Sequence, residues 1–583
     1  MQESISILRK GGGFLLGESL PEDIFTPEDF SEEQQLIRDM TRQFVESEIV
    51  PRIEEIESKD WEVTKSLLRG CGELGLLGIE VPEQYGGEAL DKISAMIVME
   101  QLGQVGSFAV TYGGQAGIGT MPIVYFGSED QKLKYLPQFT KADLFVAYAL
   151  SEASAGSDAL AARTSATLSE DGKEWVLNGE KMWITNASFA DVFITFAQVD
   201  GDKFSCFIVE RGHPGVSTGS EEQKMGLLGS STSTVILDSA RIPVENLLGE
   251  IGKGHHIAFN ILNTGRAKLA ATAVGGSKTA LNDAIGYAKE RIAFGQPIAE
   301  FGAIQHKLAE MAIRTWVTEA MVYRTAGMMD QGLEEVDVDQ AKQVMGAIEE
   351  YAVECSILKV FGTEVLDYVV DEAVQIYGGY GYSKEYPVER YYRDSRVNRI
   401  FEGTNEINRM LIPVMLLKRA QSGRLPLIEA GEQAVRAVLS GSAEAEPRES
   451  REQRAAANAR LAALFVATSV AGKYGKEVRE EQEVLMHLSN ILIETYAIDS
   501  AIGRLAKLAG SALHADVVHT FVTDATERIE SSARQALAAV VGPEELDDQL
   551  AAIHHLLLTT PADTVAARRR IARTLIEEGR YCL

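Results

Sequence analysis

The chain has 583 residues, more than one hydrophobic core usually serves, so two to four domains are expected. Its hydrophobic fraction of 45% and charged fraction of 24% are those of an ordinary globular protein. The formal net charge of -29 argues against nucleic-acid binding, which needs a basic footprint, and against adsorption to anionic lipid.

Helices are expected to dominate residues 30–144, after an N-terminal extension over residues 1–29. Ser31 and Gln34 fit a capping box, and apolar residues follow it at helical spacing. A second helix is expected near residues 92–103. The next segment is interrupted by glycines, which either let helices pack closely or leave room for a ligand: Gly113, Gly114, Gly117 and Gly119.

Residues 145–251 are expected to form a β domain. Val192–Gln198 and Phe204–Val209 are rich in β-branched and aromatic residues and predict strands. Three turn-forming pairs stand at hairpin-like spacing: Asp171-Gly172, Asn178-Gly179 and Asp200-Gly201.

Helical periodicity returns over residues 252–420, with long runs at 276–292 and 336–370. A polar break at residues 440–455 predicts a linker or an exposed loop, and residues 421–583 are expected to form an extra helical domain. This order of helices, sheet and helices predicts separate domains in a mainly α protein with a β domain, and not a doubly wound sheet.

Cysteine and histidine spacing predicts no metal site. The four cysteines lie far apart without a Cys-x-x-Cys pair, and neither histidine pair belongs to a His-Glu-x-x-His helix. Residues 1–17 lack the apolar core of a secretory signal, and no apolar run reaches the roughly 18 residues that span a bilayer. We therefore expect a soluble, cytoplasmic protein.

Generic nucleotide-binding motifs are absent: there is no Gly-x-Gly-x-x-Gly turn opening a helix and no Gly-Lys-Ser/Thr phosphate loop. Four other segments stand out together, at residues 147–158, 178–186, 375–382 and 399–409. In this order they resemble the acyl-CoA dehydrogenase family, and the resemblance covers about residues 30–420.

The resemblance implies a helical N-terminal domain, a middle β-barrel or sandwich, a C-terminal four-helix bundle, and FAD as cofactor. The extra helical domain is similar to that of the very-long-chain branch, where it occupies the place of a second dimer, so a homodimer is expected. Those relatives associate with membranes through a segment of this domain. The matching stretch here, residues 442–454, is polar, so at most weak membrane association is expected.

Several residues are expected to hold the flavin. A flavin that accepts hydride at N5 needs a donor there and an apolar wall on one ring face. Thr185 and Trp183, two apart on a predicted strand, would point the same way and supply them. By resemblance Ser151 bonds the ring, Gln375 to Gly379 bind the adenylate half across the dimer interface, and Arg291 contacts the pyrophosphate of the neighbouring subunit's FAD. The resemblance adds Tyr148, Leu150, Ile184, Phe294, Ile376, Gly378, Thr404 and Glu406 to the cofactor site.

Glu402 is the candidate catalytic base. A carboxylate in a dry pocket is a stronger base than one in water, and Phe401 and Gly403 would give it an apolar side and room for a thioester. Some relatives place the base on the helix that carries Arg266, one residue earlier, but that position is Gly265 here. By resemblance Arg266 orients the loop or the substrate, and Ser157 contacts the pantetheine arm.

The acyl pocket should accept long chains. In medium-chain relatives a carboxylate closes the bottom of the pocket, and the matching position here is Gly114. The resemblance therefore implies FAD-dependent α,β-dehydrogenation of long-chain fatty acyl-CoA to trans-2-enoyl-CoA in β-oxidation, with electrons passed to an electron-transferring flavoprotein. Glu222 matches the position at which that acceptor docks in the family.

Two alternatives remain open on sequence alone. One is an acyl-CoA oxidase, which would return electrons to oxygen. The other is a respiratory-complex assembly factor that retains the fold, although Glu402 and the flavin motifs argue against a purely structural role.

Overall fold

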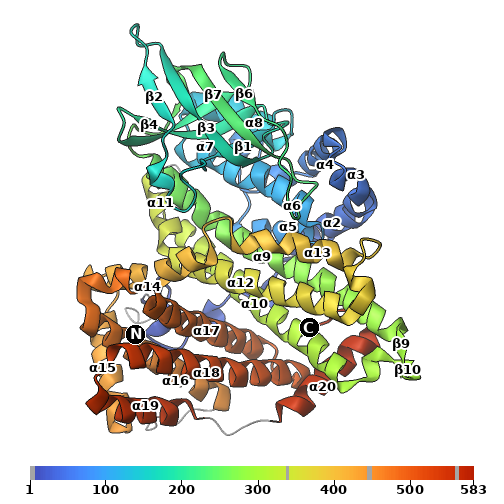
Figure 1. Cartoon of the computed structure of the whole chain (residues 1–583), viewed down its shortest axis with the longest axis vertical. Coiled ribbons are helices and arrows are strands. Elements are labelled where there is room, and N and C mark those ends of the chain that lie inside the picture. Colours follow the sequence, from blue (N-terminus) through green and yellow to red (C-terminus); the bar gives the residue numbers. More distant parts are fainter. Residues whose placement is uncertain (1–6, 337–339, 443–449, 559–562) are drawn as a thin grey trace.

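The computed structural model describes residues 7–336, 340–442, 450–558 and 563–583. It confirms the predicted fold class. A sheet domain lies at one end of the molecule, long helices form the middle, and an additional group of helices packs beside them (Figure 1).

The N-terminal helices follow the predicted pattern. The helices are α2 (Glu32–Phe44), α3 (Ile53–Glu57), α4 (Trp61–Glu73), α5 (Lys92–Leu102), α6 (Gly106–Tyr112), α7 (Met121–Phe126) and α8 (Glu129–Thr140). Ser31 caps α2 in the predicted capping box, accepting from the Gln34 N–H. The glycine-rich segment Gly113–Gly119 continues α6 as a wide π-helical turn, so it is a part of the helical layer.

An eight-stranded sheet forms the middle of the chain. Its strands are β1 (Val146–Ala149), β2 (Ser165–Leu168), β3 (Glu174–Thr185), β4 (Val192–Val199), β5 (Lys203–Glu210), β6 (Val216–Thr218), β7 (Thr232–Pro243) and β8 (Leu247–Leu248). They are ordered β6-β7-β3-β2-β4-β5-β8, and β1 pairs with β4 in parallel. Both predicted strands, near residues 192–198 and 204–209, are confirmed as β4 and β5.

One of the three expected hairpin turns is wrong. Asp171-Gly172 and Asp200-Gly201 do turn the chain between neighbouring strands. Asn178-Gly179 instead lies inside β3, where the pairing with β7 shifts by one residue. Gly179 adopts φ 154°, and a Cβ there would lie 2.4 Å from Thr164 Oγ1, so the glycine serves a close approach within a bulge.

The C-terminal bundle is built around α9 (Gly254–Glu290), which packs against α5, α10 (Gly302–Glu334) and α12 (Ala352–Tyr377). The other helices are α11 (Ala341–Glu350), α13 (Pro387–Ser395) and α14 (Asn405–Gln421), and β9 (Ile292–Ala293) pairs with β10 (Gln296–Pro297) in a hairpin. The run expected at residues 336–370 is divided at Tyr351, and its residues 337–339 lie outside the described residues.

The described part of the additional domain consists of α15 (Leu427–Ser440), α16 (Arg451–Tyr474), α17 (Gln482–Lys507), α18 (Ala512–Val540), α19 (Pro543–Leu557) and α20 (Thr564–Glu578). Residues 443–449 of the predicted linker lie outside the described residues. Helices α17 and α20 pack against α10, and α17 also packs against α14. The described chain holds one stretch, Arg451–Glu480, that is long and apolar enough to span a membrane, but 61% of its apolar window is buried inside the protein.

Candidate active site

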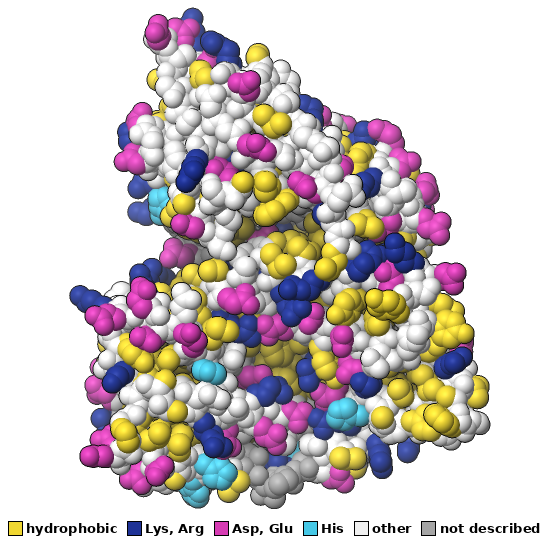
Figure 2. Space-filling view, in the orientation of Figure 1, with side chains coloured by type: hydrophobic (Ala, Val, Ile, Leu, Met, Phe, Trp, Pro, Cys, Tyr) yellow, Lys and Arg dark blue, Asp and Glu magenta, His cyan; other side chains and the backbone are white. Residues whose placement is uncertain are grey.

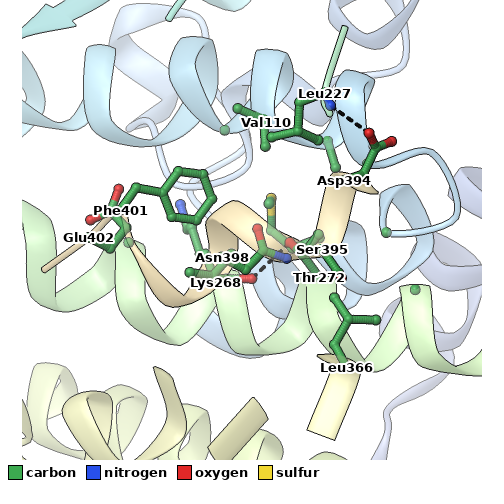
Figure 3. Close-up of a pocket in the computed structure, with 18 of the residues that line it drawn as sticks. Val110, Leu227, Lys268, Thr272, Leu366, Asp394, Ser395, Asn398, Phe401 and Glu402 are labelled. Atoms are coloured by element: carbon green, nitrogen blue, oxygen red, sulfur yellow. Dashed lines mark hydrogen bonds between the residues drawn. The ribbon is translucent and has the colours of Figure 1, made fainter. Parts of the chain in front are cut away.

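A cavity of about 140 Å³ lies between α5, α6, α9 and α13 and ends at the loop that carries Glu402. Figure 3 shows Glu402 and Phe401 at one end, with Leu227, Asp394 and Leu366 toward the other. Glycines and aliphatic side chains make up much of its wall. They include Met99, Gly103, Gly106, Ala109, Val110, Gly113, Gly114, Gly117, Ile118, Gly265, Leu269, Gly276 and Val370.

Glu402 has the backbone strain, the unpartnered carboxylate oxygen and the raised pKa that are typical of a catalytic base. Its backbone adopts φ 57°, a left-handed conformation that residues other than glycine rarely take. Its Oε2 atom is enclosed and has no hydrogen-bond partner among the described residues. Burial raises the pKa of Glu402 to about 7, and the positive charges of Arg266 and then Lys359 oppose that rise.

The loop around Glu402 is fixed through its carbonyl groups. Arg266 Nε donates to the Glu402 carbonyl oxygen at 3.1 Å, as predicted for a residue that orients the loop, and Arg266 is itself held by Asn263 Oδ1 at 2.9 Å. Asn408, which the sequence did not single out, donates to the carbonyl oxygens of Gly403 and Thr404 at 2.8 and 3.0 Å. These bonds hold the strained backbone of Glu402 in place.

Gly265 faces the base. A Cβ at this position would lie 3.1 Å from Glu402 Oε2, so any side chain here would press on the carboxylate. The helix position that carries the base in some relatives is therefore left open for the Glu402 side chain in this chain.

The predicted flavin-binding strand and the end of β1 are brought together. Met182 N donates to the Ser151 carbonyl oxygen at 2.9 Å, and buried Lys181 donates to the Leu150 carbonyl oxygen at 3.2 Å and to Glu152 at 2.7 Å. Thr185 lines the cavity that contains Glu402. Lys181 was not singled out from the sequence, because a lysine in a strand gives no sign that it is buried.

The expectation that Trp183 and Thr185 point the same way assumed a regular strand, and β3 is irregular here. The pairing of β3 with β7 shifts again between Lys181 and Ile184, and Trp183 takes φ 58°. This bulge leaves the indole 61% exposed, an unusual state for so large an apolar ring. Ile184, between them, is buried in the core of the sheet, as Ile376 is in the bundle, so both side chains are core residues.

A second group of predicted cofactor residues lies at the β9–β10 corner. Phe294 is 97% exposed, and Arg291 stacks over the Tyr380 ring at 5.4 Å, which places it beside Gly378 and Gly379. A Cβ added at either glycine would meet nothing within 4 Å, and exposed Gln375 precedes them on α12. In Figure 1 this corner is far from β3, so the two groups of predicted cofactor residues lie far apart within a single chain.

The remaining predicted residues occupy varied positions. Tyr148 is buried with its hydroxyl unpartnered among the described residues, and Ser157 is exposed in the loop after β1. Thr404 caps α14 through the Ile407 N–H, so its hydroxyl has a structural role, and Glu406 is exposed on the first turn.

Gly114 lines the cavity but does not close its far end. A Cβ there would lie 2.8 Å from Asn186 Nδ2 and 3.2 Å from Thr185 Cγ2, at the C-terminal end of β3. Gly106 lies against the far wall, because its Cβ would lie 3.4 Å from Leu227 Cδ2 and 3.6 Å from the Asp394 side chain.

The residues present suit FAD. The exposed indole of Trp183 offers a ring-sized apolar wall beside Thr185, and the open backbone at Gly378 and Gly379 lets a phosphate or adenylate approach closely. No group of three potential metal ligands occurs in the part of the chain that the structure describes.

Comparison with known proteins agrees with this geometry. Models of the acyl-CoA dehydrogenase N-terminal, middle and C-terminal domains match residues 31–143, 147–240 and 252–416, and a further acyl-CoA dehydrogenase C-terminal domain model matches residues 458–555. The chain is 46% identical to a probable acyl-CoA dehydrogenase of Bacillus subtilis, with 100% of both chains covered. It is 34% identical to the human mitochondrial very long-chain specific acyl-CoA dehydrogenase, over 90% of this chain and 82% of the human one.

Two solved structures differ in how much of this chain they match. A Bacillus anthracis acyl-CoA dehydrogenase complexed with FAD is 45% identical, with a TM-score of 0.96 over 98% of this chain and 100% of that one. Butyryl-CoA dehydrogenase from Megasphaera elsdenii is 36% identical, with a TM-score of 0.61 over 67% of this chain and 99% of its own. The chain therefore belongs to the acyl-CoA dehydrogenase family, is an oxidoreductase, and has FAD as its cofactor.

Proposed function

We propose that this dehydrogenase oxidises the Cα–Cβ bond of long-chain fatty acyl-CoA thioesters to the trans-2-enoyl products in fatty acid β-oxidation. The observation that carries the proposal is the cavity that starts at Glu402 and continues between α5, α6 and α9 as far as Leu227 and Asp394. Apolar side chains and glycines along this path suit an alkyl chain. The similarity to very long-chain specific relatives over most of the chain supports the same substrate class.

Glu402 removes the α-proton in this proposal. Its carboxylate is shielded from water, which makes it more basic, and protonation removes a buried charge. The Glu402 backbone N–H donates to no acceptor within the described residues and is available to the thioester oxygen, where negative charge develops. FAD, when bound, supplies the hydride acceptor for the β-carbon.

A substrate profile tests the chain-length claim. Turnover with acyl-CoAs from butyryl to stearoyl, measured with a dye acceptor, should favour palmitoyl-CoA over butyryl-CoA by at least tenfold in kcat/KM. A maximum at four to six carbons would reject the long-chain assignment. Oxygen uptake in the same assays should be negligible, since sustained peroxide production would mark an oxidase.

Electrons leave to an electron-transferring flavoprotein in this proposal, with Glu222 at the docking surface. Neighbouring Glu221 is occupied by the Ser231 hydroxyl and the Thr232 N–H, whereas the Glu222 carboxylate has no hydrogen-bond or ion-pair partner among the described residues. Met225 nearby is exposed. Glu222→Lys should slow reduction of the flavoprotein several-fold and leave the rate of dye reduction unchanged. Glu221→Lys cannot serve as the control, because it would break the hydrogen bonds that hold this loop.

The protein acts as a cytoplasmic homodimer in this proposal, with at most weak membrane association. Two groups of FAD-binding residues lie far apart in one chain (Figure 1), as expected if a second subunit completes each site. Hydrophobic side chains also gather at the β9–β10 corner (Figure 2), where Ile292, Phe294 and Tyr382 are exposed. Light scattering should give twice the chain mass. Phe294→Asp should yield monomers that lose FAD, and a monomeric, FAD-loaded wild type would reject the shared site.

A further inference from the structure

A second buried cation lies beneath the catalytic loop. Lys359, on α12, has no exposed surface, and its Nζ donates to Asn405 Oδ1 at 2.6 Å. Asn405 is three residues after Glu402, begins α14, and is held in turn by Thr363 at 3.1 Å and Glu364 at 3.0 Å. The Asn405 amide therefore ties the chain beyond the base to one turn of α12.

We propose that Lys359 is a positioning residue that fixes the catalytic loop through Asn405 and adds, after Arg266, a second positive charge that favours the ionised form of Glu402. This inference rests on Glu402 being the base. A buried ammonium is costly unless it is paired, and the single hydrogen bond to a neutral amide does not compensate for its charge.

The charges that face this pair come from several elements. Glu402 faces Arg266 of α9 and Lys359 of α12, and the buried Tyr148 hydroxyl of β1 lies within its field. Burial raises the pKa of Glu402, and both cations lower it again, so removal of either charge should raise it further.

Lys359 differs from Arg266 because it can lose its proton. Burial lowers the pKa of Lys359 to about 7, and Arg266 adds to that effect, while the charge of Glu402 is the largest influence that opposes it, followed by Glu364 and Glu406. When Glu402 becomes protonated, the attraction that keeps the proton on Lys359 is lost.

Three variants of the FAD-loaded enzyme test the proposal. Lys359→Gln keeps an N–H donor for Asn405 and removes the charge, Lys359→Met removes both, and Lys359→Arg keeps the charge. Flavin reduction by palmitoyl-CoA is followed in a single turnover from pH 5.5 to 9.5. FAD content and the thermal midpoint are measured alongside, to report the state of the fold.

The expected result is a shift of the acidic limb of the rate profile to higher pH by about one unit in Lys359→Gln. The rate loss should be about tenfold below pH 6 and should disappear above pH 9. Lys359→Met should show the same shift plus a pH-independent loss from the loosened loop. In Lys359→Arg the limb should lie at or below its wild-type position.

Other outcomes overturn the inference. A Lys359→Gln profile that matches the wild type, or a loss that is equal at every pH, would mean that Lys359 has only a structural role. Should the uncharged variants fail to fold, Lys359→Arg still decides, because an upward shift of its limb contradicts the charge argument. Failure of the proposed base is distinguishable, since Glu402→Gln would then remain active.

Discussion

Two buried groups of charged side chains in this protein differ in how well they are paired. Where the additional domain packs on the bundle, Arg504 of α17 donates to Glu319 at 2.6 Å and to Glu28 at 2.9 Å. At the catalytic loop, Glu402 Oε2 has no partner in the described chain, and Lys359 has one neutral acceptor.

The difference in pairing corresponds to a difference in role, because paired buried ions stabilise the fold and an unpaired carboxylate can act as a base. Paired buried ions such as Arg504 stay charged and fix how the helices pack. Removing one partner of such a pair leaves the other charge buried and uncompensated, which is costly. An unpaired carboxylate is destabilised as an anion, and its proton affinity rises toward neutral pH. An enclosed carboxylate whose proton affinity lies near neutral pH is what a catalytic base requires.

The largest effect should come from the unpaired side. Glu402→Gln removes the base while keeping the shape of the side chain, so turnover with palmitoyl-CoA should fall by roughly three or more orders of magnitude. The protein should remain yellow, since the FAD-binding residues are intact. Near-normal turnover would mean that another group removes the α-proton.

The paired side should respond in stability. Arg504→Met removes one of the two cations that pair with the buried Glu319 carboxylate, which keeps only Lys278, and the free energy of unfolding should drop by about 3 kcal/mol. Arg528→Met is the matched control: its partner is Glu494, its side chain is 42% exposed, and the loss should stay below about 1 kcal/mol. Equal losses in the two variants would remove the distinction between buried and exposed pairs.

Glu402→Gln should also stabilise the fold. The folded-state pKa of about 7 lies above the ordinary value of 4.5, so the native state favours the protonated acid. Wild-type stability should therefore decline as the pH rises from about 4.5 to 7 and stay lower above that. At pH 8 the variant should gain about 1–3 kcal/mol over the wild type, measured by denaturant unfolding of FAD-loaded protein, and the gain should shrink toward pH 4.5. A variant less stable than the wild type at pH 8 would contradict a strained carboxylate.

A smaller effect is expected at the far end of the cavity. Gly106→Leu places a side chain against Leu227 and Asp394, so kcat/KM for palmitoyl-CoA should fall about tenfold relative to octanoyl-CoA. Gly346→Leu, at an exposed position of α11 with open space around it, should leave the ratio unchanged. An unchanged ratio in Gly106→Leu would mean that the chain does not reach this wall.

Sequence reasoning reached the fold class and the order of helices, sheet and helices, because periodicity and motif order are written locally in the chain. It missed the bulges in β3, since Asn178-Gly179 has the composition of a turn and only its partner strand shows that it is not one. It placed the chain-length stop at Gly114, which faces Thr185, because spacing along a helix does not reveal what lies opposite. Lys359 escaped notice because its partner, Asn405, is far along the chain. Asn408 escaped notice although its partners are close in sequence, because the pattern does not show that its amide binds the loop carbonyls.

The central claim is that a shielded Glu402 carboxylate removes the α-proton. Its most direct test is the pH dependence of flavin reduction when FAD-loaded enzyme is mixed with palmitoyl-CoA in a single turnover without oxygen. The account predicts that the rate of flavin reduction rises with pH through an apparent pKa near 7, the value set by burial of Glu402. It also predicts that Glu402→Gln shows no flavin reduction in the single turnover. A rate that does not change between pH 5.5 and 9, or one that persists in the variant, would contradict it.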